Sequence, residues 1–152
     1  MVLYTIDEFN KEQYDIVSMI NHDFVKESSL AIASPVFGEI WICEMPILLK
    51  NDGTISFEKI ARPVLVIDDR SEHFIKHDRK NYYVLKITSQ KDTYQRVKIN
   101  NYERLGLQKE SYIRIELPIK VEKSQFLYKI GYLGPKITNT YLLKVKKYLK
   151  IS

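Results

Sequence analysis

The chain has 152 residues, of which 45% are hydrophobic and 28% charged, a composition that excludes a disordered chain and indicates one folded domain with a sizeable core. The longest apolar run near a candidate span, Pro63 to Ile67, is far shorter than the ~18 residues of a transmembrane helix. The net charge is +5, but residues 1–75 carry six basic and thirteen acidic side chains, whereas residues 76–152 carry eighteen and six. The basic half indicates either a surface for a polyanion or a solvated lysine face.

The start of the chain and its cysteine content predict a cytoplasmic protein. The first ten residues, MVLYTIDEFN, contain no Lys or Arg and no apolar stretch of signal-peptide length. The single cysteine, Cys43, cannot form an internal disulfide, which fits a reducing compartment. No histidine partner for Cys43 is suggested by the sequence, so a small buried apolar role is favoured over a catalytic thiolate.

The first predicted element is a helix from about residue 6 to residue 26. Thr5 and Glu8 have the spacing of a capping box at its start. Apolar side chains recur at intervals of four residues, at Ile16, Ile20 and Phe24. We interpret residues 1–36 as a helical extension that precedes the main domain, residues 37–152.

From Gly38 onward the sequence predicts a mainly β domain. Five short stretches are rich in β-branched and aromatic residues: GEIWICEM, RPVLVI, YYVLKIT, YQRVKI and SYIRIEL. Short strands separated by loops favour an antiparallel barrel or sandwich over alternating β and α units. Near the end, an apolar stripe of helical period predicts an amphipathic helix packed on this domain. The stripe consists of Ile137, Tyr141, Leu142, Val145, Tyr148 and Leu149.

Two predicted loops separate these strands and are suitable places for a binding or catalytic site. The first, KNDGTISFEKIA, contains Asp52-Gly53 in a turn and is longer than a minimal hairpin requires. The second, DDRSEHFIKHDRKN, contains His73 and His77, four residues apart. Because these histidines lack the glutamate of an HExxH motif and any further Cys or His cluster, a solvated pair is favoured over a metal site. We expect no metal and no cofactor.

Polar residues on neighbouring predicted strands form the candidate site. Arg62 stands at the start of an apolar strand, and Thr88 and Ser89 end the next one. In SYIRIEL, Arg114 and Glu116 alternate with isoleucines, so both are expected on the face opposite to the packed one. Periodicity alone leaves open whether they form a functional pair or a surface ion pair worth about 0.5 kcal/mol.

In this order, the motifs resemble those of the MazF/PemK/Kid family of ribosome-independent endoribonuclease toxins from bacterial toxin–antitoxin modules. The family patterns G-[DE]-[IV]-[WY], R-P-[AV]-L-[IV]-[IV], [IV]-T-[SA] and IGxL are matched by GEIW (38–41), RPVLVI (62–67), ITS (87–89) and GYL (131–133). In SYIRIELPIKVEKSQF, Val-Glu-Lys at 121–123 stands where Ile-Asp-Lys is usual. The resemblance covers residues 37 to 150, and the N-terminal extension lies outside it.

The resemblance implies a mainly β (α+β) fold, an SH3-like small barrel of about five to seven strands with a C-terminal helix, here with an extra N-terminal helix. It implies a homodimer whose RNA groove runs across both subunits, and a cognate antitoxin as protein partner. The implied activity is metal-free, sequence-specific cleavage of single-stranded RNA. The ribose 2′-OH attacks its adjacent phosphate and leaves a 2′,3′-cyclic phosphate and a free 5′-OH.

The resemblance assigns catalysis to Arg62, Thr88, Arg114 and Glu116. Arg62 would stabilise the oxyanions of the phosphorane, and Thr88 would hydrogen-bond the same phosphate. Glu116 would accept the 2′-OH proton, and Arg114 would clamp the phosphate or donate a proton. Glu116 replaces the family's usual aspartate, and the histidine that Kid-type members carry in the first loop has no counterpart. The candidate RNA-binding residues are Lys86, Ser89, Lys91 and Arg96.

Two other functions remain open from the sequence. CcdB-type toxins use the same barrel to bind DNA gyrase and have no nuclease activity, although such a protein would need neither Arg62 nor Thr88. A degenerate relative that binds RNA without cutting it would show a slope of log K against log salt near about −0.7 per phosphate contact, and no cleavage product.

Overall fold

The fold of the protein is a single large sheet with a helix at each end, as seen in a computed structural model that describes residues 3–19, 35–68, 81–89, 96–100, 102–115 and 118–150. The strands are β1 (Leu3–Thr5), β2 (Glu39–Asn51), β3 (Thr54–Val66), β4 (Asn81–Thr88), β5 (Arg96–Lys98), β6 (Tyr112–Arg114), β7 (Ile119–Glu122) and β8 (Phe126–Tyr132). The helices are α1 (Ile6–Met19) and α3 (Pro135–Leu149), with the short 3-10 helices η1 (Tyr102–Leu105) and η2 (Lys123–Gln125). Within the described ranges, no helix is long and apolar enough to cross a membrane.

The strand order is β1-β2-β3-β4-β6-β5, with β7 also paired to β4 and β8 to β2. The predicted fold class, mainly β with a helix at each end of the chain, is therefore confirmed. All five predicted strands are present, and β1, β7 and β8 bring the total to eight in the described residues. The pairings among these strands form an open sheet rather than a closed barrel.

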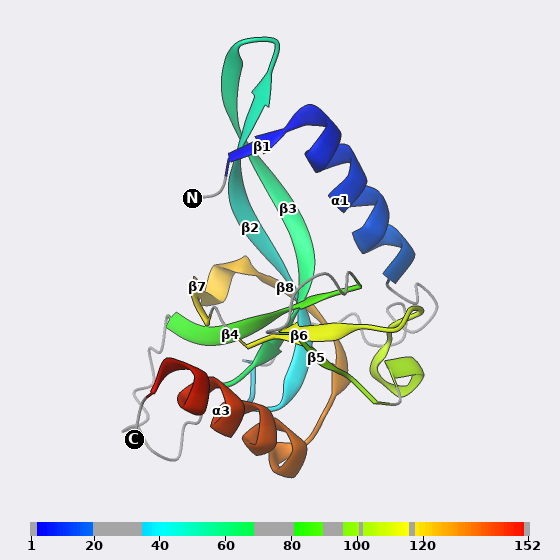
Figure 1. Ribbon diagram of the computed structural model, residues 1–152, viewed down its shortest axis with the longest axis vertical. Helices are drawn as coiled ribbons and strands as arrows, with labels where there is room; N and C mark the ends of the chain where they lie inside the picture. Colours follow the sequence, from blue (N-terminus) through cyan, green and yellow to red (C-terminus); the bar gives the residue numbers. More distant parts are fainter. Residues whose placement is uncertain are drawn as a thin grey trace.

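Strands β2 and β3 form a long hairpin that projects from the rest of the sheet (Figure 1). The prediction of a loop over KNDGTISFEKIA is wrong, because these residues end β2 and begin β3. Asp52 and Gly53 form the two-residue turn, with φ of 49° and 82°. A type I′ hairpin turn requires this positive φ at both positions. Residues 54–59 are all exposed, so the alternation that marks a strand is missing there.

The N-terminal extension is attached to this hairpin. Strand β1 pairs in parallel with β2, opposite residues 48–50, and the side chain of Tyr4 is only 8% exposed. The predicted helix start is confirmed, since the backbone N–H of Glu8 donates to the hydroxyl of Thr5 at 3.2 Å. The final third of the predicted helix, residues 20–26, lies outside the described residues.

Two apolar clusters pack against the sheet, and the main one draws on both faces of β2, with Ile40 and Ile42 from one face and Ile47 and Leu49 from the other. The main cluster contains Ile40, Ile42, Leu65, Leu85, Ile87 and Ile113 from the sheet together with Tyr141 and Val145 from α3. The second cluster lies on the face opposite to Ile40 and Ile42 and contains Trp41, Cys43, Val64, Val84, Tyr82 and Phe126. Trp41 and Tyr82 meet the ring of Phe126 edge-on, with centroid separations of 5.7 and 5.4 Å.

The C-terminal helix packs through a narrower stripe than the sequence predicts. Tyr141 and Val145 are buried, as expected, and Thr138 is buried beside them. Of the other predicted members, Leu142 is partly buried against the main cluster, whereas Ile137, Tyr148 and Leu149 are 50%, 40% and 41% exposed. The helix therefore uses one side for the sheet and leaves apolar side chains on its surface.

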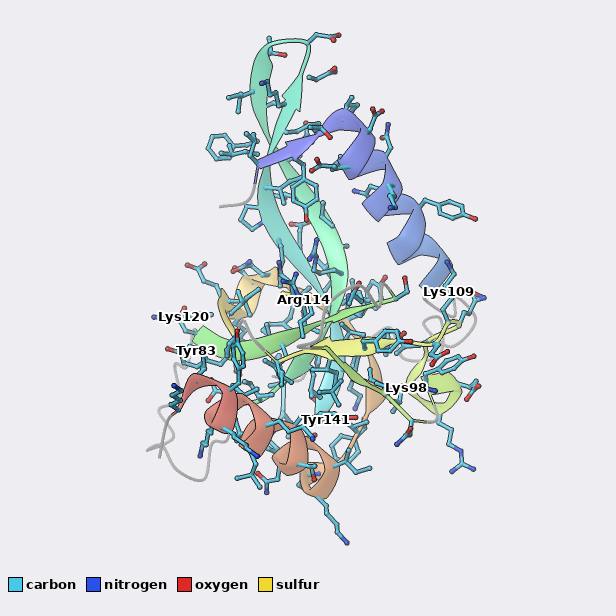
Figure 2. The ribbon with its side chains drawn as sticks, in the orientation of Figure 1. Tyr83, Lys98, Lys109, Arg114, Lys120 and Tyr141 are labelled. Atoms are coloured by element: carbon cyan, nitrogen blue, oxygen red, sulfur yellow. The ribbon has the colours of Figure 1, made fainter. Side chains whose placement is uncertain are left out.

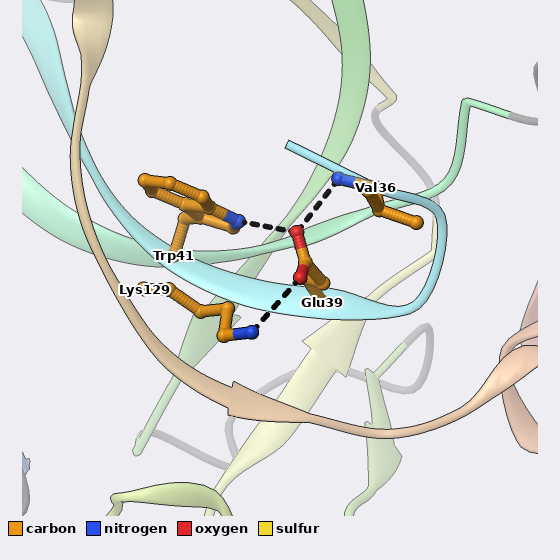
Figure 3. Close-up of polar contacts among 4 residues, drawn as sticks. All are labelled: Val36, Glu39, Trp41 and Lys129. Atoms are coloured by element: carbon orange, nitrogen blue, oxygen red, sulfur yellow. Dashed lines mark hydrogen bonds and ion pairs between the residues drawn. The ribbon is translucent and has the colours of Figure 1, made fainter. Parts of the chain in front are cut away.

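Glu39, the first residue of β2, contacts the segment before this strand and the neighbouring strand β8 (Figure 3). One carboxylate oxygen accepts hydrogen bonds from the backbone N–H of Val36 at 2.7 Å and from the indole N–H of Trp41 at 3.0 Å. The other oxygen contacts the ammonium of Lys129 on β8 at 3.1 Å. This buried acid therefore has a structural role that explains an acidic residue in the GEIW motif.

Gly131 allows β8 to lie directly on η1. A Cβ atom at this position would be 2.7 Å from the carbonyl oxygen of Leu105 and 2.9 Å from its carbonyl carbon. Both are backbone atoms, so a side chain here would force two chain segments apart. The glycine of the GYL motif is therefore explained by packing.

We expect Gly131→Ala to lower the free energy of unfolding by about 1–3 kcal/mol because the added methyl group overlaps the η1 backbone. Urea denaturation followed by far-UV circular dichroism measures this change. Gly53→Asn is the matched control, since no atom lies within 4 Å of a Cβ at Gly53 and asparagine tolerates positive φ. Equal stability of Gly131→Ala and the parent would contradict the packing argument.

Candidate active site

The register of the strands places the predicted polar residues on one face of the sheet. Val64 pairs with Lys86 and Thr88 pairs with Tyr112. Paired residues lie on the same face, and so do residues two apart on one strand. Residues sharing the face of Val64 are therefore Arg62, Lys86, Thr88, Tyr112 and Arg114.

The backbone of Arg96 pairs with that of Arg114, which places Arg96 at a register position on this face. Figure 2 labels Arg114 beside the base of the β2–β3 hairpin. Ile113 and Ile115 are buried, at 0% and 8% exposed, whereas Arg114 is half-buried. The predicted alternation is confirmed for Arg114 and the isoleucines beside it, which pack while Arg114 lies on the face of Arg62.

Arg62 is itself nearly buried, at 7% exposed. It lies on β3 with Cys43 as its Cα partner on β2. Its guanidinium Nη2 donates a hydrogen bond to the hydroxyl oxygen of Tyr4 at 2.9 Å. The arginine that begins the apolar RPVLVI stretch is thus held inside the fold, at the junction between the sheet and the N-terminal extension.

The positive charge of Arg114 acts on the guanidinium of Arg62. Burial lowers the pKa of Arg62 below its ordinary value, and the positive charge of Arg114 acts in the same direction, while the hydroxyl of Tyr4 opposes both. An arginine nevertheless keeps its proton at neutral pH. Two cations brought together at a partly desolvated place repel each other and favour an anion between them.

Thr88 is the last residue of β4 and lies on this face, Ser89 follows the strand, and both residues are half-buried. Lys86 is more deeply placed than a solvated lysine, at 8% exposed. Two predicted site residues, Glu116 and Lys91, lie outside the described residues, as does the side chain of Arg96. The described candidates that share one face are therefore Arg62, Lys86, Thr88 and Arg114.

Tyr4 contacts the candidate residue Arg62, and the sequence did not predict this contact. The triplet LYT before the predicted helix contains two β-formers, and this was the available signal for a short strand. Three residues are too few for a periodic pattern, and the hydrogen-bond partner of Tyr4 is 58 positions away along the chain. No local pattern reports such a contact.

Cys43 lies on the same face as Arg62, but its thiol is not a reactive nucleophile at neutral pH. Its side chain is fully buried, and this burial, with the nearby charge of Glu44, raises the thiol pKa from 9.0 to about 12. The thiol stays protonated at neutral pH, and only a thiolate is a strong nucleophile. This supports the expectation of a buried apolar role.

No group of three or more His, Cys, Asp or Glu side chains that could hold a metal ion occurs among the residues that the structure describes. His73 and His77 lie outside those residues. The chemistry available on the described face is therefore that of cationic and hydroxyl hydrogen-bond donors, which suits an anionic ligand such as a phosphate.

Comparison with known proteins gives a family match. The sequence pattern described as "PemK-like, MazF-like toxin of type II toxin-antitoxin system" matches residues 37–152. No curated protein sequence matches the chain. The matched region includes Arg62, Thr88 and Arg114, and Tyr4 lies before it.

Solved structures of low sequence identity share the fold. MazF from Deinococcus radiodurans (Form-I) gives a TM-score of 0.57 at 12% identity, covering 78% of this chain and 99% of that chain. The Mycobacterium tuberculosis toxin MazF-mt6 gives 0.53 at 18% identity, covering 75% and 98%. An endoribonuclease from a mycobacterial species, solved in complex with its cognate antitoxin, gives 0.54 at 16% identity, covering 78% and 98%.

The raised pKa of Cys43 predicts a loss of stability at high pH. In the unfolded chain the thiol ionises above about pH 9, whereas in the folded protein it stays protonated up to about pH 12. Its contribution to stability is therefore complete below pH 9 and is lost as the pH rises towards 12.

Between about pH 8 and about pH 10.5, we expect the parent to lose roughly 2 kcal/mol more unfolding free energy than Cys43→Ala. Urea denaturation of both proteins at the two pH values measures this difference, and the variant corrects for tyrosines and lysines that titrate in the same range. If both proteins lose the same amount, the thiol is not held protonated by the fold.

Proposed function

Because the chain belongs to the family of PemK-like, MazF-like toxins of type II toxin–antitoxin systems, we propose that it is an endoribonuclease that cuts single-stranded RNA at specific sequences without a metal. The observation that carries this proposal is the register of the sheet, which puts Arg62, Thr88 and Arg114 on one face. These residue types are the ones that stabilise a reacting phosphate.

In the proposed reaction, the 2′-OH of one ribose attacks its own 3′-phosphate, and the bond from phosphorus to the next 5′-oxygen breaks. The products are a 2′,3′-cyclic phosphate and a 5′-OH, so no water is consumed. Negative charge grows on the non-bridging oxygens as the fifth bond to phosphorus forms. Arg62 and Arg114 present planar groups of N–H donors that match two such oxygens, and their repulsion is relieved when that charge develops.

Proton transfer completes the proposed mechanism. Thr88 donates a hydrogen bond to the same phosphate from the end of β4. Glu116, as the resemblance implies, accepts the proton of the 2′-OH, and a proton must reach the leaving 5′-oxygen. Arg114 is the candidate donor for that step, or it acts as a second phosphate clamp.

RNA binding is proposed to use the basic second half of the chain. Lys86 lies two residues before Thr88 on β4, Ser89 directly follows that strand, and Lys91 and Arg96 come later in the sequence. Requiring the 2′-OH as nucleophile makes DNA a non-substrate. Bases are proposed to be read by surfaces around the site, because phosphate contacts alone carry no sequence information.

The proposed partners are an antitoxin and a second copy of the chain. An endoribonuclease of the same fold has been solved in complex with its cognate antitoxin. An antitoxin with an acidic or amphipathic tail would neutralise this chain by occupying the basic face. A homodimer would carry the RNA groove across both subunits.

We expect Arg62→Ala to reduce the rate of RNA cleavage by at least about 10²-fold, since it removes a donor aimed at the developing oxyanion. The assay incubates purified protein with a long single-stranded RNA in excess EDTA, maps the cut sites and identifies the end groups. The parent should give discrete cuts with 5′-OH and 2′,3′-cyclic phosphate ends.

Arg104→Ala is the matched control, because Arg104 is an exposed arginine on η1 and is none of the proposed catalytic or RNA-binding residues. It should cut RNA like the parent. Full activity of Arg62→Ala would overturn the catalytic assignment. Intact RNA with the antitoxin-free parent, or cleavage that EDTA abolishes, would overturn the proposed function, and poisoning of DNA gyrase would then identify a gyrase-binding toxin.

A further inference from the structure

The hydrogen bond between Arg62 and Tyr4 joins the proposed catalytic arginine to a segment outside the family match. Arg62 lies within residues 37–152, whereas Tyr4 belongs to β1 in the extension. The donor–acceptor distance is 2.9 Å, and both side chains are nearly buried, at 7% and 8% exposed. A charge-assisted hydrogen bond at a buried place is stronger than a neutral one at the surface.

Tyr4 is fixed by the sheet and by the core. Its backbone pairs with Leu49, which lies six residues from Cys43 on β2 and therefore on the same face as Cys43 and Arg62. Tyr4 belongs to the main apolar cluster, as do Leu49 and Ile60 of the hairpin. The phenol is thus packed into the core, with its hydroxyl reaching the guanidinium, and is a permanent part of the fold rather than a surface lid.

The chemistry of a phenol suits an orienting role. As a neutral acceptor, the hydroxyl oxygen of Tyr4 can fix the plane of the guanidinium without cancelling its positive charge. A long arginine side chain otherwise loses rotamer entropy each time it binds an anion. An arginine oriented in advance does not incur that loss in the transition state.

We propose that Tyr4 is a positioning residue of the active site, which orients the Arg62 guanidinium for the scissile phosphate and makes the N-terminal extension part of the catalytic apparatus. This inference rests on the proposed ribonuclease function. It assigns β1 a role, since the strand carries Tyr4 to the face of the sheet where Arg62 lies.

The test compares Tyr4→Phe, which removes only the hydroxyl, with Tyr14→Phe. Tyr14 lies on the same extension, is 71% exposed and contacts Lys109 through its ring, which phenylalanine keeps. We expect Tyr4→Phe to lower kcat for RNA cleavage on the order of tenfold, with KM changed less than about twofold. Tyr14→Phe should match the parent, and Tyr4→Phe should add no further loss in an Arg62→Ala background.

Three outcomes would overturn the inference. Unchanged kcat means that the hydroxyl does not assist catalysis, and a raised KM alone means that Tyr4 only binds RNA. A rise in activity means that Tyr4 holds Arg62 away from the substrate and inhibits the enzyme.

A second readout does not depend on cleavage. Side-chain nitrogen NMR of Arg62 should show restricted rotation of the guanidinium in the parent and in Tyr14→Phe, and faster rotation in Tyr4→Phe. An identical Arg62 signal in all three proteins overturns the positioning role, whether or not RNA is cut. If the parent cuts no RNA but the signal changes, the proposed function fails while the orienting contact stands, so the two failures are distinguishable.

Discussion

The uninterrupted pairing of β2 with β3 is the constraint on which the rest of the structure depends. It runs from the pair Ile40–Leu65 to the pair Asn51–Thr54 without a shift in register. A slip of one residue would exchange the two faces of the strand, moving Arg62 into the apolar cluster beneath α3 and Leu65 out of it. The positive φ of both turn residues sets this register at one end, and the packing of alternating residues on both faces holds it at the other.

Much of the fold follows from local patterns, and the failures have physical causes. The β-branched runs around Trp41, Val64 and Leu85 predict buried strands, and these strands form. The outer half of the hairpin does not look like a strand, because its β3 residues are exposed on both faces and therefore need no alternation. The apolar stripe on α3 predicts more buried residues than the structure has. Helical period identifies a set of apolar residues but does not say which of them the sheet covers, and Ile137 is one that stays exposed.

The candidate site likewise includes residues that the sequence predicted and a contact that it did not. Arg62, Thr88 and Arg114 stand at strand positions where alternation and strand ends already single them out, and their common face then follows from pairing. The contact of Tyr4 with Arg62 was not predictable, because it depends on a parallel pairing between segments more than forty residues apart. Long-range pairings of this kind leave no periodic signal in either segment.

The hydroxyl of Tyr4 meets two opposing requirements on Arg62, which are burial and a full positive charge. Catalysis on a phosphate favours a desolvated cation, because a low local dielectric strengthens its attraction to the developing charge, yet burial makes an isolated cation costly. A carboxylate would offset that cost but cancel part of the charge. The hydroxyl of Tyr4 supplies a hydrogen bond to the buried guanidinium and leaves its charge intact. Under the proposed function, the extension then supplies a neutral hydrogen-bond partner to a buried catalytic cation.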